Sequence, residues 1–100
     1  MVERIVLIKL LEEHRSGEKR TEIAQHSRQV LPRVPGVRAV WVGVPADDRC
    51  AQSWDLCLIV RFDSVEDIPA YASHPKHRSY VDEYLRPRME GIAAYNFQVG

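Results

Sequence analysis

Hydrophobic residues gather in four short runs along the chain, and each run has the length and composition of a β-strand. The runs lie at residues 3–11, 37–44, 54–62 and 92–99. They are rich in valine, isoleucine, leucine and aromatic residues, which favour extended backbone. Glycine, proline and polar residues lie between them and mark turns or connections. The pattern therefore predicts four strands joined by longer segments.

The first run is apolar on both faces of the strand that it predicts. Because side chains alternate along a strand, Val6, Ile8 and Leu10 share one face while Ile5 and Leu7 share the other. One layer of helices covers only one face of a sheet. The second apolar face therefore needs a partner other than the helices of the same chain.

Two of the connecting segments have features of helices. The first helix is predicted from Thr21, a candidate cap, to about Leu31, with a start one turn earlier as the alternative. A capping-box pattern opens a second helix over residues 64–73. His74 and Pro75 then break it, and the helix restarts at the proline with the histidine in the cap position.

The resulting order of elements is β-α-β-β-α-β, with a broken second helix and a turn-rich loop at residues 45–53. This order predicts a ferredoxin-like α+β fold. One hundred residues are the size of one ordinary domain, so we expect residues 1–100 to form a single domain.

Composition and charge narrow the class of protein. Hydrophobic residues make up 45% of the chain and charged residues 28%, as in an ordinary globular protein. Fourteen basic residues balance fourteen acidic ones, so charge favours neither nucleic acid nor a membrane as a partner. No apolar stretch is long enough for a signal sequence or a membrane span. We therefore expect a soluble, cytoplasmic protein in which Cys50 and Cys57 are reduced.

Five segments carry a resemblance to a known family. They are 2–11 (VERIVLIKLL), 34–37 (VPGV), 62–64 (FDS), 71–77 (YASHPKH) and 84–87 (YLRP). In this order they resemble the stress-responsive A/B barrel (Dabb) family over essentially the whole chain, and the HPxH step is the most specific of them. The resemblance implies a homodimer. Two ferredoxin-like sheets would pack their helix-free faces together as a dimeric α+β barrel.

The resemblance also implies a candidate site. A plant branch of the family, the olivetolic acid cyclases, closes a polyketide chain by aldol condensation with a tyrosine and a histidine beside the HPxH step. The matching positions are Tyr71 and His77. A histidine can remove a proton beside a carbonyl, and a tyrosine hydroxyl can hold the enolate oxygen. Tyr71 and His77 are therefore the candidate catalytic residues, and the candidate ligand-binding residues are Arg4, Val6, Ile8, His74 and Tyr80.

Two positions depart from the family pattern. Arg4 stands where many members carry a histidine, and its guanidinium could bind a carboxylate. The first helix has Ile23, Ala24 and Ser27 where the plant cyclases place bulky aromatic residues. A pocket built from these residues should accept a ligand different from that of the plant cyclases. We expect a small organic carbonyl compound, whose identity the sequence does not specify.

The site hypothesis predicts a cavity between sheet and helices, lined by Tyr71, His77 and the face of Val6 and Ile8. Under the alternative, the core there is solid and His77 is hydrogen-bonded to the backbone. These side chains then only pack the core, and the protein is a non-catalytic stress-response or interaction protein. A polyketide cyclase-like or cofactor-free monooxygenase-like enzyme is a further alternative. The pattern of motifs indicates neither a metal nor a cofactor.

Overall fold

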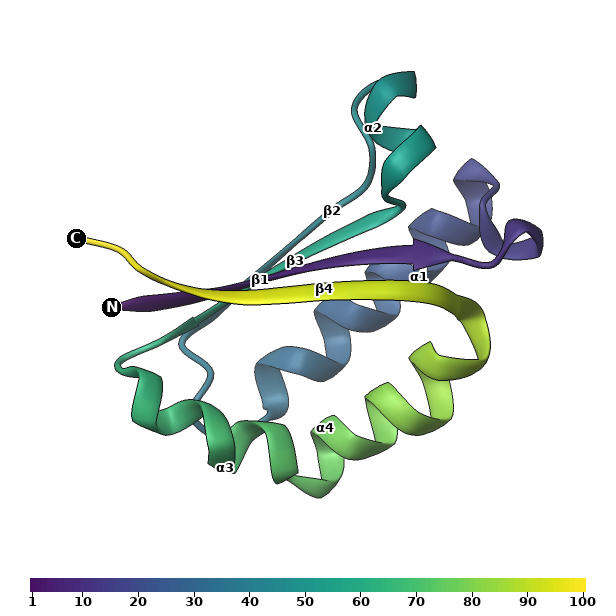
Figure 1. The fold of residues 1–100 in the computed structure, drawn as a ribbon. Coiled ribbons are helices and arrows are strands. Elements are labelled where there is room, and N and C mark those ends of the chain that lie inside the picture. Colours follow the sequence, from purple (N-terminus) through teal and green to yellow (C-terminus); the bar gives the residue numbers. More distant parts are fainter.

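In the computed structural model, which describes residues 1–100, four strands form one antiparallel sheet. They are β1 (Val2–Leu10), β2 (Ala39–Gly43), β3 (Leu56–Phe62) and β4 (Met89–Gln98). Their order in the sheet is β2-β3-β1-β4, so the first and third strands occupy its centre. This arrangement confirms the predicted ferredoxin-like α+β fold (Figure 1).

The helices between the strands cover one face of the sheet. Helix α1 (Gly17–Val30) follows β1, whereas the second helical region is broken into α3 (Ile68–Ser73), α4 (Pro75–Ser79) and a π-helical segment, η4 (Tyr80–Leu85). Figure 1 shows all of these segments on the same side of the sheet. None of the helices combines the length and hydrophobicity that crossing a bilayer requires.

Helix α1 begins one turn before Thr21, as the alternative start predicted. Its cap is Ser16, whose Oγ accepts a hydrogen bond from the backbone N–H of Lys19 at 3.2 Å. Thr21 lies inside the helix, and its hydroxyl donates to the carbonyl of Gly17 at 2.9 Å. The prediction of Thr21 as the cap is therefore wrong, because a serine one turn earlier makes the same kind of bond.

The loop predicted at residues 45–53 contains a short helix, α2 (Asp48–Ser53). Asp47 caps it by accepting a hydrogen bond from the N–H of Cys50 at 2.8 Å. No residue of α2 is buried, so the segment has no apolar stripe by which periodicity could detect it. The capping aspartate is the one local signal for this helix.

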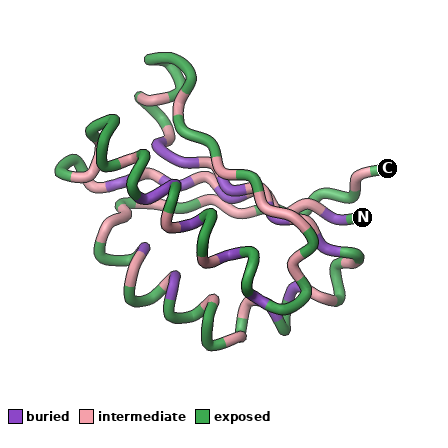
Figure 2. The backbone as a smooth tube through the Cα atoms, turned by 180° about the vertical axis from the view of Figure 1, so that it is seen from behind, coloured by how far each residue is buried: buried purple, intermediate pink, exposed green.

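The hydrophobic core lies between the sheet and the helices on its covered face. Sixteen buried residues form this core, and burial alternates along the two central strands (Figure 2). Ile8 and Leu10 from β1 and Val60 and Phe62 from β3 have no exposed surface. The alternation places every second side chain of these strands against the helices.

The other face of the sheet carries no helix and is rich in apolar side chains. Trp41, Tyr95 and Phe97 on this face are 48%, 63% and 54% exposed. Glu3 and Arg61 form an ion pair with an N–O distance of 2.5 Å. By the strand register, the helix-free face consists of Glu3, Ile5, Leu7, Lys9, Ala39, Trp41, Gly43, Cys57, Ile59, Arg61, Gly91, Ala93, Tyr95 and Phe97.

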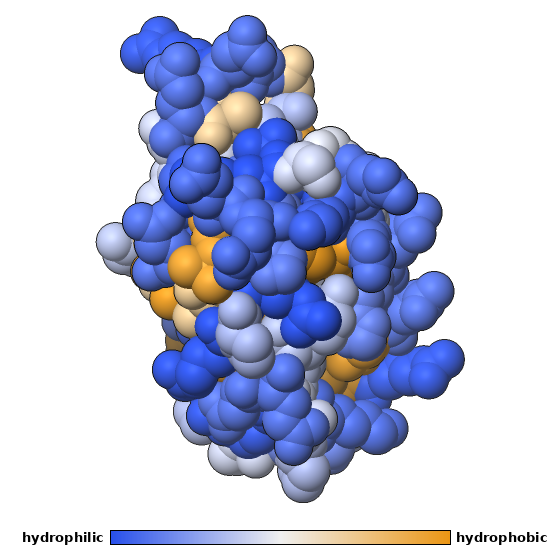
Figure 3. Space-filling view, turned by 90° about the vertical axis from the view of Figure 1, so that its right-hand side faces the viewer, coloured by the Kyte–Doolittle hydropathy of each residue, from blue (hydrophilic) through white to orange (hydrophobic).

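A buried aspartate joins three elements at one end of the sheet. Asp55, just before β3, has no exposed surface. Its carboxylate accepts hydrogen bonds from the N–H of Leu10 at 2.8 Å and from Arg20 Nε at 2.9 Å. This end of the molecule is mostly hydrophilic, with hydrophobic atoms in small separate areas (Figure 3). Asp55 thus ties β1, β3 and α1 together through one charged group.

Candidate functional site

The break between α3 and α4 positions the two candidate catalytic residues. His74 has extended backbone, and its Nδ1 accepts a hydrogen bond from the N–H of Lys76 at 3.1 Å. Pro75 occupies the first helical position, where its missing N–H costs nothing. The predicted cap and restart of the helix are confirmed. The same bond occupies one ring nitrogen of His74, a residue proposed as a ligand contact.

Tyr71 and His77 lie on opposite sides of the break and their rings touch. The ring centroids are 4.4 Å apart, and the planes are inclined by 48°. On its other side Tyr71 packs edge-on against Phe62, with a centroid distance of 4.9 Å. The change in chain direction at residues 74 and 75 therefore brings together two side chains that a continuous helix would separate.

The backbone fixes the tautomer of His77. Its Nδ1 lies 3.0 Å from the carbonyl oxygen of Ala72. Because a carbonyl only accepts, Nδ1 carries the hydrogen, and the lone pair of the neutral ring is on Nε2. Burial lowers the pKa of His77, and the charges of Arg78 and Arg4 lower it further, while the bond to Ala72 raises it. The bond to the backbone is the one that the alternative of core packing predicts, and the neutral ring that it holds can accept a proton at Nε2.

Tyr71 can donate a hydrogen bond, whereas His77 can accept a proton. Burial raises the pKa of Tyr71 to about 12, although the charge of Arg4 lowers it. The phenol therefore remains protonated at neutral pH and can donate a hydrogen bond. Every fully buried side-chain nitrogen or oxygen has a partner, so the hydroxyl of Tyr71, which makes no hydrogen bond, reaches the surface.

Arg4 completes this group of side chains. Arg4 lies on the same face of β1 as Val6 and Ile8, and its charge lowers the pKa values of both Tyr71 and His77. One guanidinium nitrogen donates to Asn96 Oδ1 on the neighbouring strand at 2.9 Å. The group consists of a base, a hydroxyl donor and a cation. These are the parts needed to bind a carbonyl compound and remove an adjacent proton.

Val6 and Ile8 have a different environment from the one predicted. They belong to the hydrophobic core and are 8% and 0% exposed. A ligand would contact them only after the core opened. The structure therefore does not place the predicted cavity against these two strand residues.

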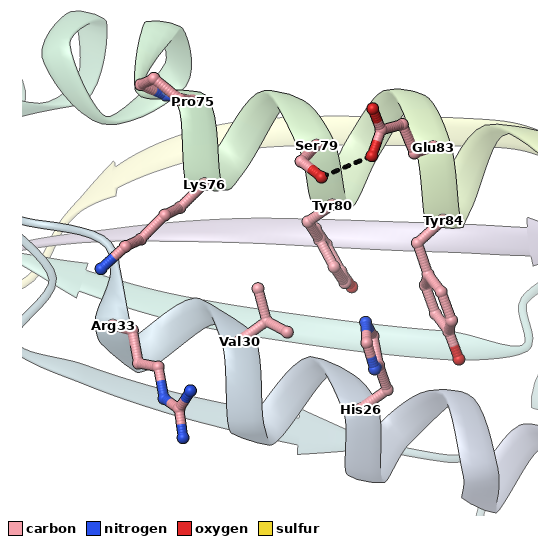
Figure 4. Close-up of a pocket in the computed structure, with 9 residues that line it drawn as sticks. All are labelled: His26, Val30, Arg33, Pro75, Lys76, Ser79, Tyr80, Glu83 and Tyr84. Atoms are coloured by element: carbon pink, nitrogen blue, oxygen red, sulfur yellow. Dashed lines mark hydrogen bonds between the residues drawn. The ribbon is translucent and has the colours of Figure 1, made fainter.

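A groove lies elsewhere on the molecule, between α1 and the α4–η4 region (Figure 4). Its volume is about 680 Å³. Tyr80 is the one predicted site residue that lines it, whereas Tyr71 and His77 do not. The lining residues are His26, Val30, Arg33, Pro75, Lys76, Ser79, Tyr80, Glu83 and Tyr84.

Sequence reasoning predicted Tyr80 as a site residue but missed His26 and Tyr84 of this groove. His26 is half-buried and stacks on Tyr84, with ring centroids 3.8 Å apart and planes inclined by 25°. The available signal was the spacing of His26, Val30 and Arg33 at i, i+4 and i+7, which places them on one helix face. The predicted site included none of these three residues. No group of three or more histidine, cysteine or acidic side chains could hold a metal ion.

The comparison with family models decides the classification. Residues 2–99 match the model described as "Stress responsive A/B Barrel Domain" (Dabb). The chain belongs to this family. The Dabb match spans all four strands and both helical regions, in agreement with the segments that carried the resemblance. No curated protein matches the chain significantly.

Solved structures share the Dabb fold at low sequence identity. An Arabidopsis thaliana protein superposes with a TM-score of 0.82 at 17% identity, covering 100% of this chain and 96% of that chain. A dimeric ferredoxin-like protein from Bacteroides fragilis gives 0.76 at 22% identity, covering 98% and 95%. A hydroxynitrile lyase from Passiflora edulis gives 0.78 at 17% identity, covering 99% and 93%. At these identities the likeness establishes the fold alone.

Proposed function

We propose that this Dabb protein is a homodimer that binds a small organic carbonyl compound beside Tyr71 and His77. The observation that carries the proposal is the His77 ring, which lies against Tyr71 with Nδ1 tied to the backbone and Nε2 free of hydrogen bonds within the chain. His77 acts as the base and Tyr71 as the hydrogen-bond donor. Arg4 attracts the negative charge that develops.

The chemical step is the removal of a proton from the carbon next to the carbonyl. His77 Nε2 takes the proton, and the electron pair of the C–H bond moves to form an enolate. The hydroxyl of Tyr71 donates a hydrogen bond to the enolate oxygen, and the imidazolium then returns a proton to carbon. The existence of a hydroxynitrile lyase with the same fold is consistent with catalysis on this scaffold.

The test of the site uses acetophenone in D₂O, with deuterium incorporation into its methyl group followed by proton NMR. We expect exchange with the natural chain to exceed the buffer rate. The substitution His77→Gln should lower the enzymatic rate by about 10²- to 10⁴-fold because it removes the base. Tyr71→Phe should lower it by about 10²-fold because it removes the donor.

The matched control is His14→Gln, a half-buried histidine in a short 3₁₀ turn. This variant should keep the exchange rate of the natural chain. A folded natural chain with no exchange above buffer would contradict the catalytic step and favour a non-catalytic stress-response protein. Equal exchange rates for His77→Gln and the natural chain would show that His77 is not the base.

Support for the dimer comes from the helix-free face. Trp41, Tyr95 and Phe97 would leave a large aromatic surface in water in a monomer. The charged pair Glu3–Arg61 on the same face is already matched, so covering it leaves no lone charge. A Bacteroides fragilis protein of this fold is dimeric. A stable interface of ordinary size covers about 800 Å² on each partner, which one face of a small sheet can supply.

Solution mass tests the dimer directly. Light scattering after size-exclusion chromatography should give twice the chain mass for the natural protein. Phe97→Glu should give the monomer mass, because it places a charge in the covered face. Val65→Glu changes a residue of similar exposure away from the sheet, 50% against 54%, and should remain a dimer. A monomeric natural chain at micromolar concentration would contradict the proposal.

A further inference from the structure

We propose that the groove between α1 and the α4–η4 region is a second ligand site, which takes a small aromatic carboxylate. The aromatic end of the groove receives the ring of the ligand, and the cationic end receives its carboxylate. Figure 4 shows the two ends: His26, Tyr80 and Tyr84 lie at one, and Arg33 and Lys76 at the other. Val30 lies between them and supplies apolar contact.

The aromatic end is built from three nearly parallel rings. His26 stacks on Tyr84, and Tyr80 lies 6.2 Å from His26 and 6.1 Å from Tyr84, with planes inclined by 17° and 18°. The hydroxyl of Tyr80 is anchored to Ser27 Oγ at 2.6 Å. This end therefore presents a fixed aromatic surface, and a flat ring can pack on it at small entropic cost.

The second face of Tyr84 is already occupied. The guanidinium carbon of Arg88 lies 4.1 Å from the centroid of the Tyr84 ring. His26 lies at 3.8 Å from the same centroid, so the two groups must cover opposite faces. A ligand in the groove would thus contact the half-buried His26 ring rather than insert beside Tyr84, while Tyr80, which is 3% exposed, holds its place in the core behind His26.

The cationic end carries two basic side chains without partners. Neither Arg33 nor Lys76 makes a side-chain hydrogen bond or ion pair, and both line the groove, Lys76 extending from α4 toward the segment that carries Arg33 in Figure 4. Basic side chains nearby are satisfied: Arg28 donates to the carbonyl of Val42 at 2.8 Å, and Arg78 pairs with Asp82 at 2.7 Å. Both side chains are exposed, and with no partner in the chain they are free to pair with an anionic group on a ligand in the groove.

The acidic residue of the groove does not neutralise this end. The carboxylate of Glu83 accepts a hydrogen bond from the hydroxyl of Ser79 at 2.8 Å, within its own helical segment. Figure 4 shows this pair beside Tyr80 and Tyr84 rather than beside Arg33. Charge in the groove is therefore separated, with the positive end free to receive an anion.

The size of the groove matches a small molecule. Its volume of about 680 Å³ lies within the range of about 300–1,000 Å³ that is typical of small-molecule pockets. Tyr71 and His77 do not line it, so this site goes beyond the proposed carbonyl site. A ring carrying one carboxylate uses both ends of the groove, which a neutral ring or an aliphatic acid cannot do.

The test uses 2-naphthoate as the probe and follows backbone amide shifts of the full chain by NMR. Shifts should concentrate on residues 26–33 and 76–84. The neutral isostere 2-naphthamide and the aliphatic anion hexanoate are the matched ligand controls. We expect 2-naphthoate to bind at least about threefold more tightly than either control, because only it combines a ring and a charge.

Variants locate the charge contacts. Arg33→Gln and Lys76→Gln should each weaken 2-naphthoate binding about three- to tenfold and leave 2-naphthamide unchanged. Arg49→Gln, an exposed arginine on α2 with no ion pair, should have no effect. Tyr71→Phe should also leave 2-naphthoate binding unchanged, because Tyr71 belongs to the carbonyl site and does not line the groove.

Three results would overturn the proposal. Equal affinities for 2-naphthoate and 2-naphthamide would show that the charge of the ligand does not contribute to binding. An unchanged affinity for 2-naphthoate in the double variant Arg33→Gln/Lys76→Gln would show that the two cations do not bind the ligand. Shifts centred on Tyr71 and His77 instead of the groove would place the aromatic acid in the carbonyl site and leave the groove without a ligand.

Discussion

The ionisation of His77 depends on the fold. Burial lowers its pKa from the ordinary value, so the folded protein favours the neutral ring. The unfolded chain therefore binds more protons in the interval between the two pKa values. The stabilising contribution of the neutral ring is complete above the pKa of the unfolded chain and declines as pH falls through the folded pKa.

This sign gives a prediction about acid stability. Between pH 7.5 and pH 5, the melting temperature of the natural chain should fall further than that of His77→Gln. Glutamine keeps a polar side chain that can donate to the carbonyl of Ala72, but it does not titrate. Thermal unfolding followed by circular dichroism at the two pH values measures the difference. Parallel decreases in both proteins would show that His77 does not contribute to the pH dependence.

At the scale of the elements, one hydrogen bond joins α1 to the broken second helix. Ser27 Oγ donates to the carbonyl of Ile23 at 2.8 Å, so the 2.6 Å contact with Tyr80 uses the tyrosine hydroxyl as donor. Both residues are buried. Tyr80→Phe should lower the free energy of unfolding by about 1–2 kcal/mol, since it removes the donor and leaves an acceptor without a partner. Urea unfolding measures this change.

Tyr84→Phe is the matched control for that variant. The hydroxyl of Tyr84 makes no hydrogen bond, and the residue is half-buried. Its free energy of unfolding should stay within about 0.5 kcal/mol of the natural value. If both tyrosine variants lost the same stability, the bond to Ser27 would not be the cause.

The buried Asp55 lies just before β3 and joins it to β1 and α1. Asp55→Ala would leave Arg20 and the N–H of Leu10 without their acceptor. We expect a loss of about 3–5 kcal/mol in the free energy of unfolding, as for other broken buried pairs. Urea unfolding measures it, and Asp55→Asn, which keeps an acceptor, should lose less.

Asp63 offers a surface comparison with Asp55. It pairs with Arg38 at 2.5 Å, but both side chains are more than half exposed. Asp63→Ala should therefore change the free energy of unfolding little, because exposed ion pairs are screened by solvent. A loss as large as that of Asp55→Ala would mean that burial does not explain the difference between the two sites.

At the scale of the whole molecule, the sheet has one face covered by helices and one open apolar face. If two copies cover the open faces mutually, folding and association are linked. The melting temperature of the natural chain should then rise with protein concentration between about 1 and 100 μM, by mass action. Scanning calorimetry at several concentrations measures this, and the melting temperature of monomeric Phe97→Glu should stay constant.

Much of the fold was predictable because the signals are local. The four apolar runs marked the strands, and the capping box at Ser64 is present, with the Ser64 N–H donating to Asp67 Oδ2 at 3.2 Å. The break at His74 and Pro75 follows from the chemistry of those two residues. Helix α2 escaped detection because it buries nothing.

The candidate site was predictable only in part. The resemblance indicated Tyr71 and His77, and the structure brings their rings into contact. The predicted contact of a ligand with Val6 and Ile8 instead became core packing. His26 was not among the predicted site residues, and its ring stacks on Tyr84, more than fifty residues away in the chain. Such a contact has no periodic signature in either helix alone.

Local chemistry in the sequence was enough for the order of the elements, the two apolar faces of β1 and the helix break, because each depends on neighbours within a few turns or on strand alternation. Tertiary structure decided which side chains meet. It placed Asp55 against Arg20, His26 against Tyr84 and the unpaired cations beside the groove. These contacts depend on how helices pack across the sheet, and packing is set by the whole core rather than by any single segment.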